Sequence, residues 1–144
     1  MRLACLHGQN DRMMKKTIVS LFALALLAAC GGASGPTPAD LAGEAAKVYY
    51  EQLLHGDYAS FVDGTYRPDS IPQGYREQLI ANAKMFVGQQ KDEHRGITAV
   101  RVIRADADTA HHVATVYLGL SYGDNGSEQV AVPMVEHGGV WYMR

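Results

Sequence analysis

Cysteine is scarce in this chain of 144 residues, which holds only Cys5 and Cys30. Neither belongs to a CxxC pair, and no cysteine follows residue 30. Residues 31–144 therefore cannot carry a disulfide, a cysteine nucleophile, a redox pair or a cysteine–zinc site. A domain in this part of the chain must be held together by its hydrophobic core.

Positively charged residues are also fewer than negatively charged ones. The chain has 13 Lys and Arg against 15 Asp and Glu, a net charge of -2. Leaving out the four basic residues and the one acidic residue that precede Cys30 gives the remainder a net charge of about -5. Nucleic acids and anionic lipid headgroups bind basic surfaces, so an acidic domain is a poor partner for them. We expect no nucleic-acid partner.

No apolar run is long enough to cross a bilayer. The longest covers residues 18–29, with Ser20 as its only polar member, whereas a spanning helix needs about 20 apolar residues. Lys15 and Lys16 precede this run, and small residues end it. A basic start, a short apolar core and small residues at the end are typical of a secretory signal peptide. We predict a signal over residues 1–29, in which 1–12 fit either an upstream start codon or an unusually long basic region.

The predicted signal ends in Leu27-Ala28-Ala29-Cys30. This motif resembles the lipobox of bacterial lipoproteins, and the resemblance implies that Cys30 is lipidated and that the signal is cut before it. Residues 30–38 then form the lipidated cysteine and a tether rich in Gly, Ser and Pro, a composition that forms flexible linkers. The implied location is the cell envelope, facing the periplasm. Gly31 is not the aspartate associated with inner-membrane retention, which favours the outer membrane.

Residues 39–144 are predicted to form one domain that begins with helices. The first helix is expected over residues 38–55, with Thr37 as its N-cap and Gly56 as its stop. A short helix over 58–63 and a longer one over 73–93 should follow, joined by a loop containing Pro68 and Pro72. The 3.6-residue period of the first helix directs one set of side chains inward: Leu41, Ala45, Val48, Tyr49 and Leu53.

From Gly96 onward the hydrophobic period changes to two, which is typical of strands. Strands are predicted over residues 97–105, 110–122, 127–136 and 140–144, with turns at 106–109, 123–126 and 137–139. Alternation in the second strand directs one set inward: His112, Ala114, Val116, Leu118, Leu120 and Tyr122. The sequence therefore predicts an α+β domain, with N-terminal helices packed on one face of a twisted four-stranded antiparallel sheet.

Two short motifs carry a family resemblance. His55-Gly56-Asp57-Tyr58, continuing to Phe61-Val62, and the closing Gly138-Gly139-Val140-Trp141-Tyr142 are similar to the opening and the last strand of the cystatin-like, nuclear-transport-factor-2-like (NTF2-like) roll. Within that superfamily the chain resembles small bacterial lipoproteins. The resemblance implies a cone between sheet and helices. Some members are enzymes, such as ketosteroid isomerases and dehydratases, and many are binding modules, so the fold does not decide the function.

Few side chains stand out as candidates for chemistry. No inward carboxylate aligns with the base and oxyanion donors of the isomerases, so we predict no catalytic residue. His111 and His112 are adjacent on a predicted strand and should point to opposite faces, which argues against a shared metal ion. Neither a metal nor a cofactor is expected. Tyr75 and His112 are the predicted pocket-lining residues. The predicted core residues are Tyr49, Phe61, Phe86, Leu118 and Trp141.

These observations lead to three functional hypotheses. The first is a membrane-anchored lipoprotein whose domain binds a small ligand or an envelope protein without catalysis. The second is an enzyme of the isomerase or dehydratase type that acts on a small apolar substrate in the cone. The third is a structural module that forms a homodimer through the sheet face carrying Val113, Thr115 and Tyr117, since exposed apolar patches mark partner sites.

Overall fold

The computed structural model describes residues 35–144; the predicted signal, Cys30 and the first part of the tether lie outside the described residues. The helices are α2 (Pro38–Leu54), α3 (Tyr58–Asp63) and α4 (Gln73–His94). The strands are β1 (Ile97–Asp108), β2 (Val113–Tyr122), β3 (Ser127–His137) and β4 (Val140–Met143).

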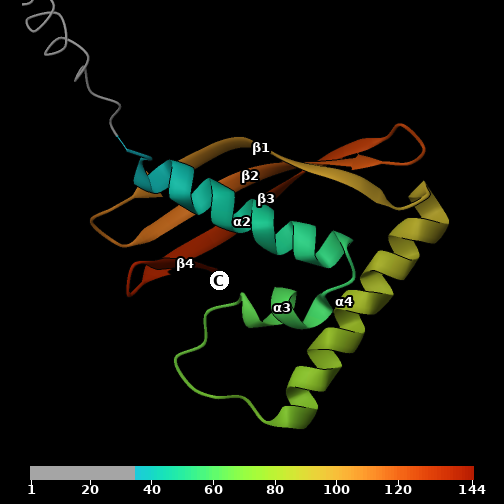
Figure 1. Ribbon diagram of the computed structural model, residues 1–144, viewed down its shortest axis with the longest axis horizontal. Coiled ribbons are helices and arrows are strands. Elements are labelled where there is room, and N and C mark those ends of the chain that lie inside the picture. The colour runs from blue at the N-terminus through green and yellow to red at the C-terminus, as the bar shows by residue number, and fades with distance from the viewer. Residues whose placement is uncertain (1–34) are drawn as a thin grey trace, which may run out of the picture. The chain divides into compact units, whose positions relative to one another are not determined.

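Each strand pairs antiparallel with the next, giving one sheet in the order β1-β2-β3-β4. Helix α2 lies across one face of this sheet, and α4 extends away from it (Figure 1). The predicted α+β architecture is confirmed. Within the described part of the chain, no helix has both the length and the apolar character needed to cross a bilayer.

Helix α2 begins and ends at local signals that the sequence displays. The Thr37 hydroxyl accepts the backbone N–H of Asp40, and the Asp40 carboxylate accepts the backbone N–H of Thr37, which completes a capping box. At the other end Gly56 has a φ of +83°, a conformation that glycine adopts without strain. Asp57 then caps α3 by accepting the backbone N–H of Ser60.

The buried face of α2 is made mainly of small residues, and this differs in part from the prediction. Of the predicted inward residues, Leu53 is buried, and Ala45 and Tyr49 are partly buried against the core. Ala42, Gly43 and Ala46 are buried together with Leu53, whereas the predicted inward residues Leu41 and Val48 are 48% and 40% exposed. Small side chains let the helix backbone approach the sheet closely. A Cβ added to Gly43 would lie 3.3 Å from Val102 Cγ1 on β1.

The core lies between α2 and the face of β2 that alternation predicted. From Ala114 to Tyr122, every second residue of β2 is buried, and Leu118 is completely inaccessible. Trp141 is buried as predicted. Tyr49 and Phe61 are partly buried and pack against this core, and the Tyr49 hydroxyl donates to the Trp141 carbonyl over 2.9 Å. The other buried members of the cluster are Ala42, Ala46, Val100, Val132, Met134 and Met143.

The first strand turn lies later in the chain than predicted. Strand β1 continues to Asp108, whose carboxylate accepts the backbone N–H groups of Ala110 and His111 and so organises the turn. Strand β2 starts only at Val113. His112 lies in the turn with a φ of 54° and is exposed. The prediction that His112 points into the core is therefore wrong, because strand alternation does not extend to it.

Helix α4 is long but contributes little to the core. Only Ala83 of its 22 residues is buried, and Phe86, a predicted core residue, is 40% exposed. The helix is held near its ends. Arg76 bonds to Asp63 at the end of α3, and beyond the other end the Gly123 backbone N–H donates to the Gly96 carbonyl. The prediction for Phe86 is wrong because the middle of α4 does not lie flat on the sheet (Figure 1).

Candidate functional site

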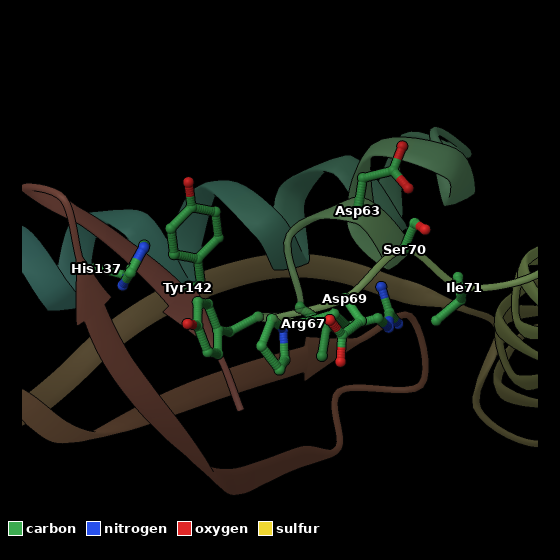
Figure 2. A pocket seen from close by; sticks show the side chains of 10 residues that line it. Asp63, Arg67, Asp69, Ser70, Ile71, His137 and Tyr142 are labelled. Atoms are coloured by element: carbon green, nitrogen blue, oxygen red, sulfur yellow. The ribbon is translucent and has the colours of Figure 1, made fainter.

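A surface hollow of about 370 Å³ lies where the loop after α3 passes beside β4. Figure 2 shows His137 and Tyr142, from β3 and β4, on one side, and Asp63, Ser70 and Ile71 on the other, with Arg67 and Asp69 between them. Its size falls at the lower end of the range for small-molecule sites. The lining residues are Asp63, Thr65, Tyr66, Arg67, Pro68, Asp69, Ser70, Ile71, His137 and Tyr142.

One wall of the hollow is aromatic. The Tyr66 ring lies 5.2 Å from the His137 ring and 6.0 Å from the Tyr142 ring, centroid to centroid, with both pairs tilted. Tilted contacts at these distances are favourable for aromatic pairs. Tyrosine and histidine combine apolar ring faces with polar atoms, so this wall can contact both an apolar group and a hydrogen-bonding group of a ligand.

Hydrogen bonds attach the start of the loop, which carries most of the lining, to β4 and α3. The Tyr66 N–H donates to the Met143 carbonyl over 2.7 Å, and the Met143 N–H donates to the Gly64 carbonyl over 2.9 Å. Thr65 forms a parallel bridge with Met143. Arg67 Nη1 donates to the Val62 carbonyl at the end of α3 over 2.9 Å. The start of the loop is thereby attached to the sheet, and the Arg67 guanidinium is held in place.

Charges of both signs face the hollow. Arg76 on α4 donates two hydrogen bonds to Asp63, from Nε to Oδ1 over 2.8 Å and from Nη2 to Oδ2 over 2.6 Å. These hydrogen bonds hold the pKa of Asp63 below its usual value. The Asp63 charge is thus compensated from outside the hollow. Arg67 and Asp69 add one positive and one negative group.

A second polar cluster lies where α4 ends against the sheet. The Tyr122 hydroxyl donates to Glu128 over 2.8 Å. Burial, and then this bond to Glu128, raises the pKa of Tyr122 to about 12. The His94 ring lies 4.9 Å from the Tyr122 ring, and its Nδ1 is 2.9 Å from Asp124 Oδ2. Glu128, the second residue of β3, pairs with Leu120 and is exposed, at the strand-end position that the sequence indicated.

The structure does not bring the two predicted pocket residues together. Tyr75 is 53% exposed near the start of α4, and His112 lies in the β1–β2 turn, where its Nδ1 is 2.6 Å from Glu136 Oε2. Neither lines the hollow. Cys30, the predicted lipidation site, lies outside the described residues. Within residues 35–144, no group of three or more His, Cys, Asp or Glu side chains is arranged to hold a metal ion.

The residues that do line the hollow carry only a weak sequence signal. Tyr66-Arg67-Pro68-Asp69 places an aromatic ring and both charges in four consecutive positions, but Pro68 and Pro72 indicated only a connecting loop. The contact of Tyr66 with Tyr142 depends on the long-range bridge between Thr65 and Met143. No periodicity within the loop predicts that contact.

Comparison with known proteins identifies the fold. No protein-family model and no curated protein matches the chain. Among solved structures, a Campylobacter jejuni protein described provisionally as an NTF2-like transpeptidase is similar over 68% of this chain and 92% of that chain, with a TM-score of 0.56 and 11% sequence identity. At that identity the similarity concerns the fold and carries no residue roles. The described residues therefore form a domain of the NTF2-like fold, as the resemblance in the sequence implied.

Proposed function

We propose that this chain is a lipid-anchored protein of the bacterial cell envelope whose domain binds a small ligand in the hollow beside β4, without catalysis. The observation that carries the proposal is the attachment of Tyr66 and Arg67, at the start of the lining loop, to Met143 and Val62 before any ligand arrives. A preformed site avoids much of the cost of ordering side chains on binding. An envelope protein that inserts one small group into the same hollow is the other partner class.

The anchor rests on the Leu27-Ala28-Ala29-Cys30 motif. Cys30→Ser should move the protein from the membrane fraction to the soluble periplasmic fraction or leave it uncleaved, because the thiol that takes the lipid is gone. Cys5→Ser is the matched control and should leave the distribution unchanged. Mature Cys30→Ser protein that still fractionates with membranes after a salt wash would refute lipid anchoring.

Two tyrosine substitutions test the binding site. The sequence predicts Tyr75 as a pocket-lining residue, whereas the structure places Tyr66 in the lining of the hollow. A fragment library is screened by NMR against the full chain in detergent. Tyr66→Ala should lose the fragments that bind the wild-type protein, because it removes the central ring of the aromatic wall. Tyr75→Ala should retain them, because Tyr75 is exposed outside the hollow. The reverse result would place the ligand near α4.

An enzymatic function is the alternative that the Tyr122–Glu128 pair favours. The exposed Glu128 carboxylate can reach a substrate as a base, and the Tyr122 hydroxyl that donates to it here could turn to a small carbonyl compound as a hydrogen-bond donor. The assay is exchange of hydrogen for deuterium next to the carbonyl of a small ketone, followed by NMR. Exchange that depends on Glu128 and is lost in Glu128→Gln would favour an enzyme over a binding module.

A homodimer through the sheet is the remaining alternative. Val113, Thr115 and Tyr117 share the face of β2 opposite the core and are only partly buried. Arg104 on β1 lies 4.4 Å above the Tyr117 ring, a cation–π contact on the same face. Sedimentation of the full chain in detergent tests this: a dimer that Thr115→Glu dissociates would support it, and a monomer would refute it.

A further inference from the structure

We propose that the hollow recognises a small zwitterion, a free α-amino acid or a dipeptide, with the carboxylate of the ligand on Arg67 and its ammonium group on Asp69. This inference rests on the proposed ligand-binding function and specifies its ligand class. Three properties of the hollow support it: the charges of Arg67 and Asp69, which are unpaired among the described residues, the hydrogen bond that positions the Arg67 guanidinium, and the small size and aromatic wall of the hollow.

The charge pattern selects against ligands with one sign of charge. Asp63 is engaged by Arg76 through two hydrogen bonds, and the charge of Arg67 also helps to lower the pKa of Asp63, so the charge of Asp63 is compensated. Within residues 35–144, neither Arg67 nor Asp69 belongs to an ion pair. An anion in the hollow meets Asp69, and a cation meets Arg67. Only a ligand that carries both charges satisfies both groups, which is a selection by repulsion as well as by attraction.

The guanidinium of Arg67 is prepared for a carboxylate. Its Nη1 donates to the Val62 carbonyl, which restricts the position of the group. A guanidinium has about five N–H donors in a rigid fork, so most of them stay available to a ligand. Charge-assisted bonds from such a fork to a carboxylate are among the stronger hydrogen bonds in proteins.

The volume and the aromatic wall suit a small ligand. The hollow is open to solvent, and its volume of about 370 Å³ lies at the lower end of the range for small-molecule sites. That range includes an amino acid and a small dipeptide. The rings of Tyr66, His137 and Tyr142 provide the apolar surface for that side chain.

The test compares one ligand with versions of itself that lack a single charge. The full chain, labelled with ¹⁵N and held in detergent micelles, is titrated with L-phenylalanine, N-acetyl-L-phenylalanine, L-phenylalaninamide and glucose. We expect L-phenylalanine to shift the backbone resonances of residues 65–71. The acetylated probe lacks the ammonium group and the amide probe lacks the carboxylate. Each should bind roughly tenfold more weakly, the effect of one lost charge-assisted bond.

Two reciprocal variants assign the charges. Arg67→Gln should bind L-phenylalanine no better than L-phenylalaninamide, and Asp69→Asn should bind it no better than the acetylated probe. Arg104→Gln, an arginine on β1 away from the hollow, should keep the wild-type ranking. The reciprocal pattern keeps the test valid even if Arg67→Gln disturbs the bond to Val62.

The outcomes separate the ligand class from the binding function. If the acetylated probe, the amide or glucose binds at this loop as tightly as L-phenylalanine, the proposal of a zwitterionic ligand is wrong, but the proposed ligand-binding function is still supported. If neither these probes nor the fragment library shifts any resonance of residues 65–71, the binding function fails, and the zwitterion fails with it.

Discussion

Substitution of Gly64 by alanine should destabilise the domain and distort the hollow together. Gly64 is buried at the end of α3, and a Cβ built there would lie 2.5 Å from Tyr49 Cε1 and 3.0 Å from Tyr49 Cγ. Both distances are too short for carbon atoms in contact. The backbone of Gly64 has a φ of −70°, so alanine itself is not strained there. The whole effect must come from the collision with the ring.

The magnitude follows from what Tyr49 does. Moving the ring into a filled core costs about 1–3 kcal/mol. Losing the bond from its hydroxyl to the Trp141 carbonyl adds about 0.5–1.5 kcal/mol. We therefore expect Gly64→Ala to lower the free energy of unfolding by roughly 2–4 kcal/mol. The Gly64 carbonyl also accepts the Met143 N–H, so loop resonances near Tyr66 should shift in the folded variant.

Urea denaturation followed by circular dichroism measures this effect. Gly88→Ala is the matched control, because nothing lies within 4 Å of a Cβ there, and an alanine inside α4 should stabilise the helix by about 0.5–1 kcal/mol. In a Tyr49→Ala background the cost of Gly64→Ala should largely disappear, since the colliding ring is absent. A loss below about 0.5 kcal/mol in the wild-type background would refute the reasoning.

Three further perturbations test other contacts. Trp141→Ala should lower the free energy of unfolding by about 3–5 kcal/mol in the same urea assay, because it removes a buried ring from the core; a loss below about 1 kcal/mol would contradict its core position. Ala46→Leu should lower the free energy of unfolding by about 1–3 kcal/mol, because α2 has no room for a larger side chain against the sheet. An unchanged urea midpoint would show that there is room for leucine at this position. The lowered pKa of Asp63 stabilises the fold above the pKa of the unfolded chain, and that stabilisation is lost as the pH falls through the pKa of the folded state. Arg76→Gln should therefore lose less stability than the wild type between about pH 6 and about pH 3, and equal losses in the two proteins would argue against this pair.

Local signals made the helices predictable. Thr37, Gly56 and Asp57 act within a few residues of themselves, and each occupies the capping or stop position that its chemistry favours. Alternation likewise identified the core face of β2 from Ala114 to Tyr122. The order of elements, the antiparallel sheet and the NTF2-like fold all follow from such short-range patterns.

The errors arose where tertiary contacts override local preference. Leu41 and Val48 are larger and more apolar than Ala42 and Ala46, so the pattern placed Leu41 and Val48 inward. Close approach of α2 to the sheet requires the small residues instead. The turn was displaced because Asp106 and Asp108 have equal turn preference, and only Asp108 organises it.

The hollow could not be predicted from the sequence for a different reason. Its lining combines a loop with the ends of β3 and β4, and the contact between them exists only once Thr65 has paired with Met143. The prediction of Tyr75 and His112 as pocket-lining residues depends on an expected cone. In the structure Tyr75 is exposed on α4, and His112 lies in a turn outside the sheet. Chemistry that depends on long-range pairing has no periodic signature in the sequence.

The two edge strands of the sheet, β1 and β4, are poorly suited to pairing with a strand from another molecule. At the β4 edge, the Tyr66 N–H and the Gly64 carbonyl already occupy the backbone carbonyl and N–H of Met143. At the β1 edge, register shifts at Ile97/Ala99 and at Val102/Arg104 break the line of N–H and C=O groups that another strand would need. Neither edge offers a straight template for strand addition. Many copies of the domain confined to a two-dimensional surface can therefore collide repeatedly without joining into a continuous intermolecular β-sheet.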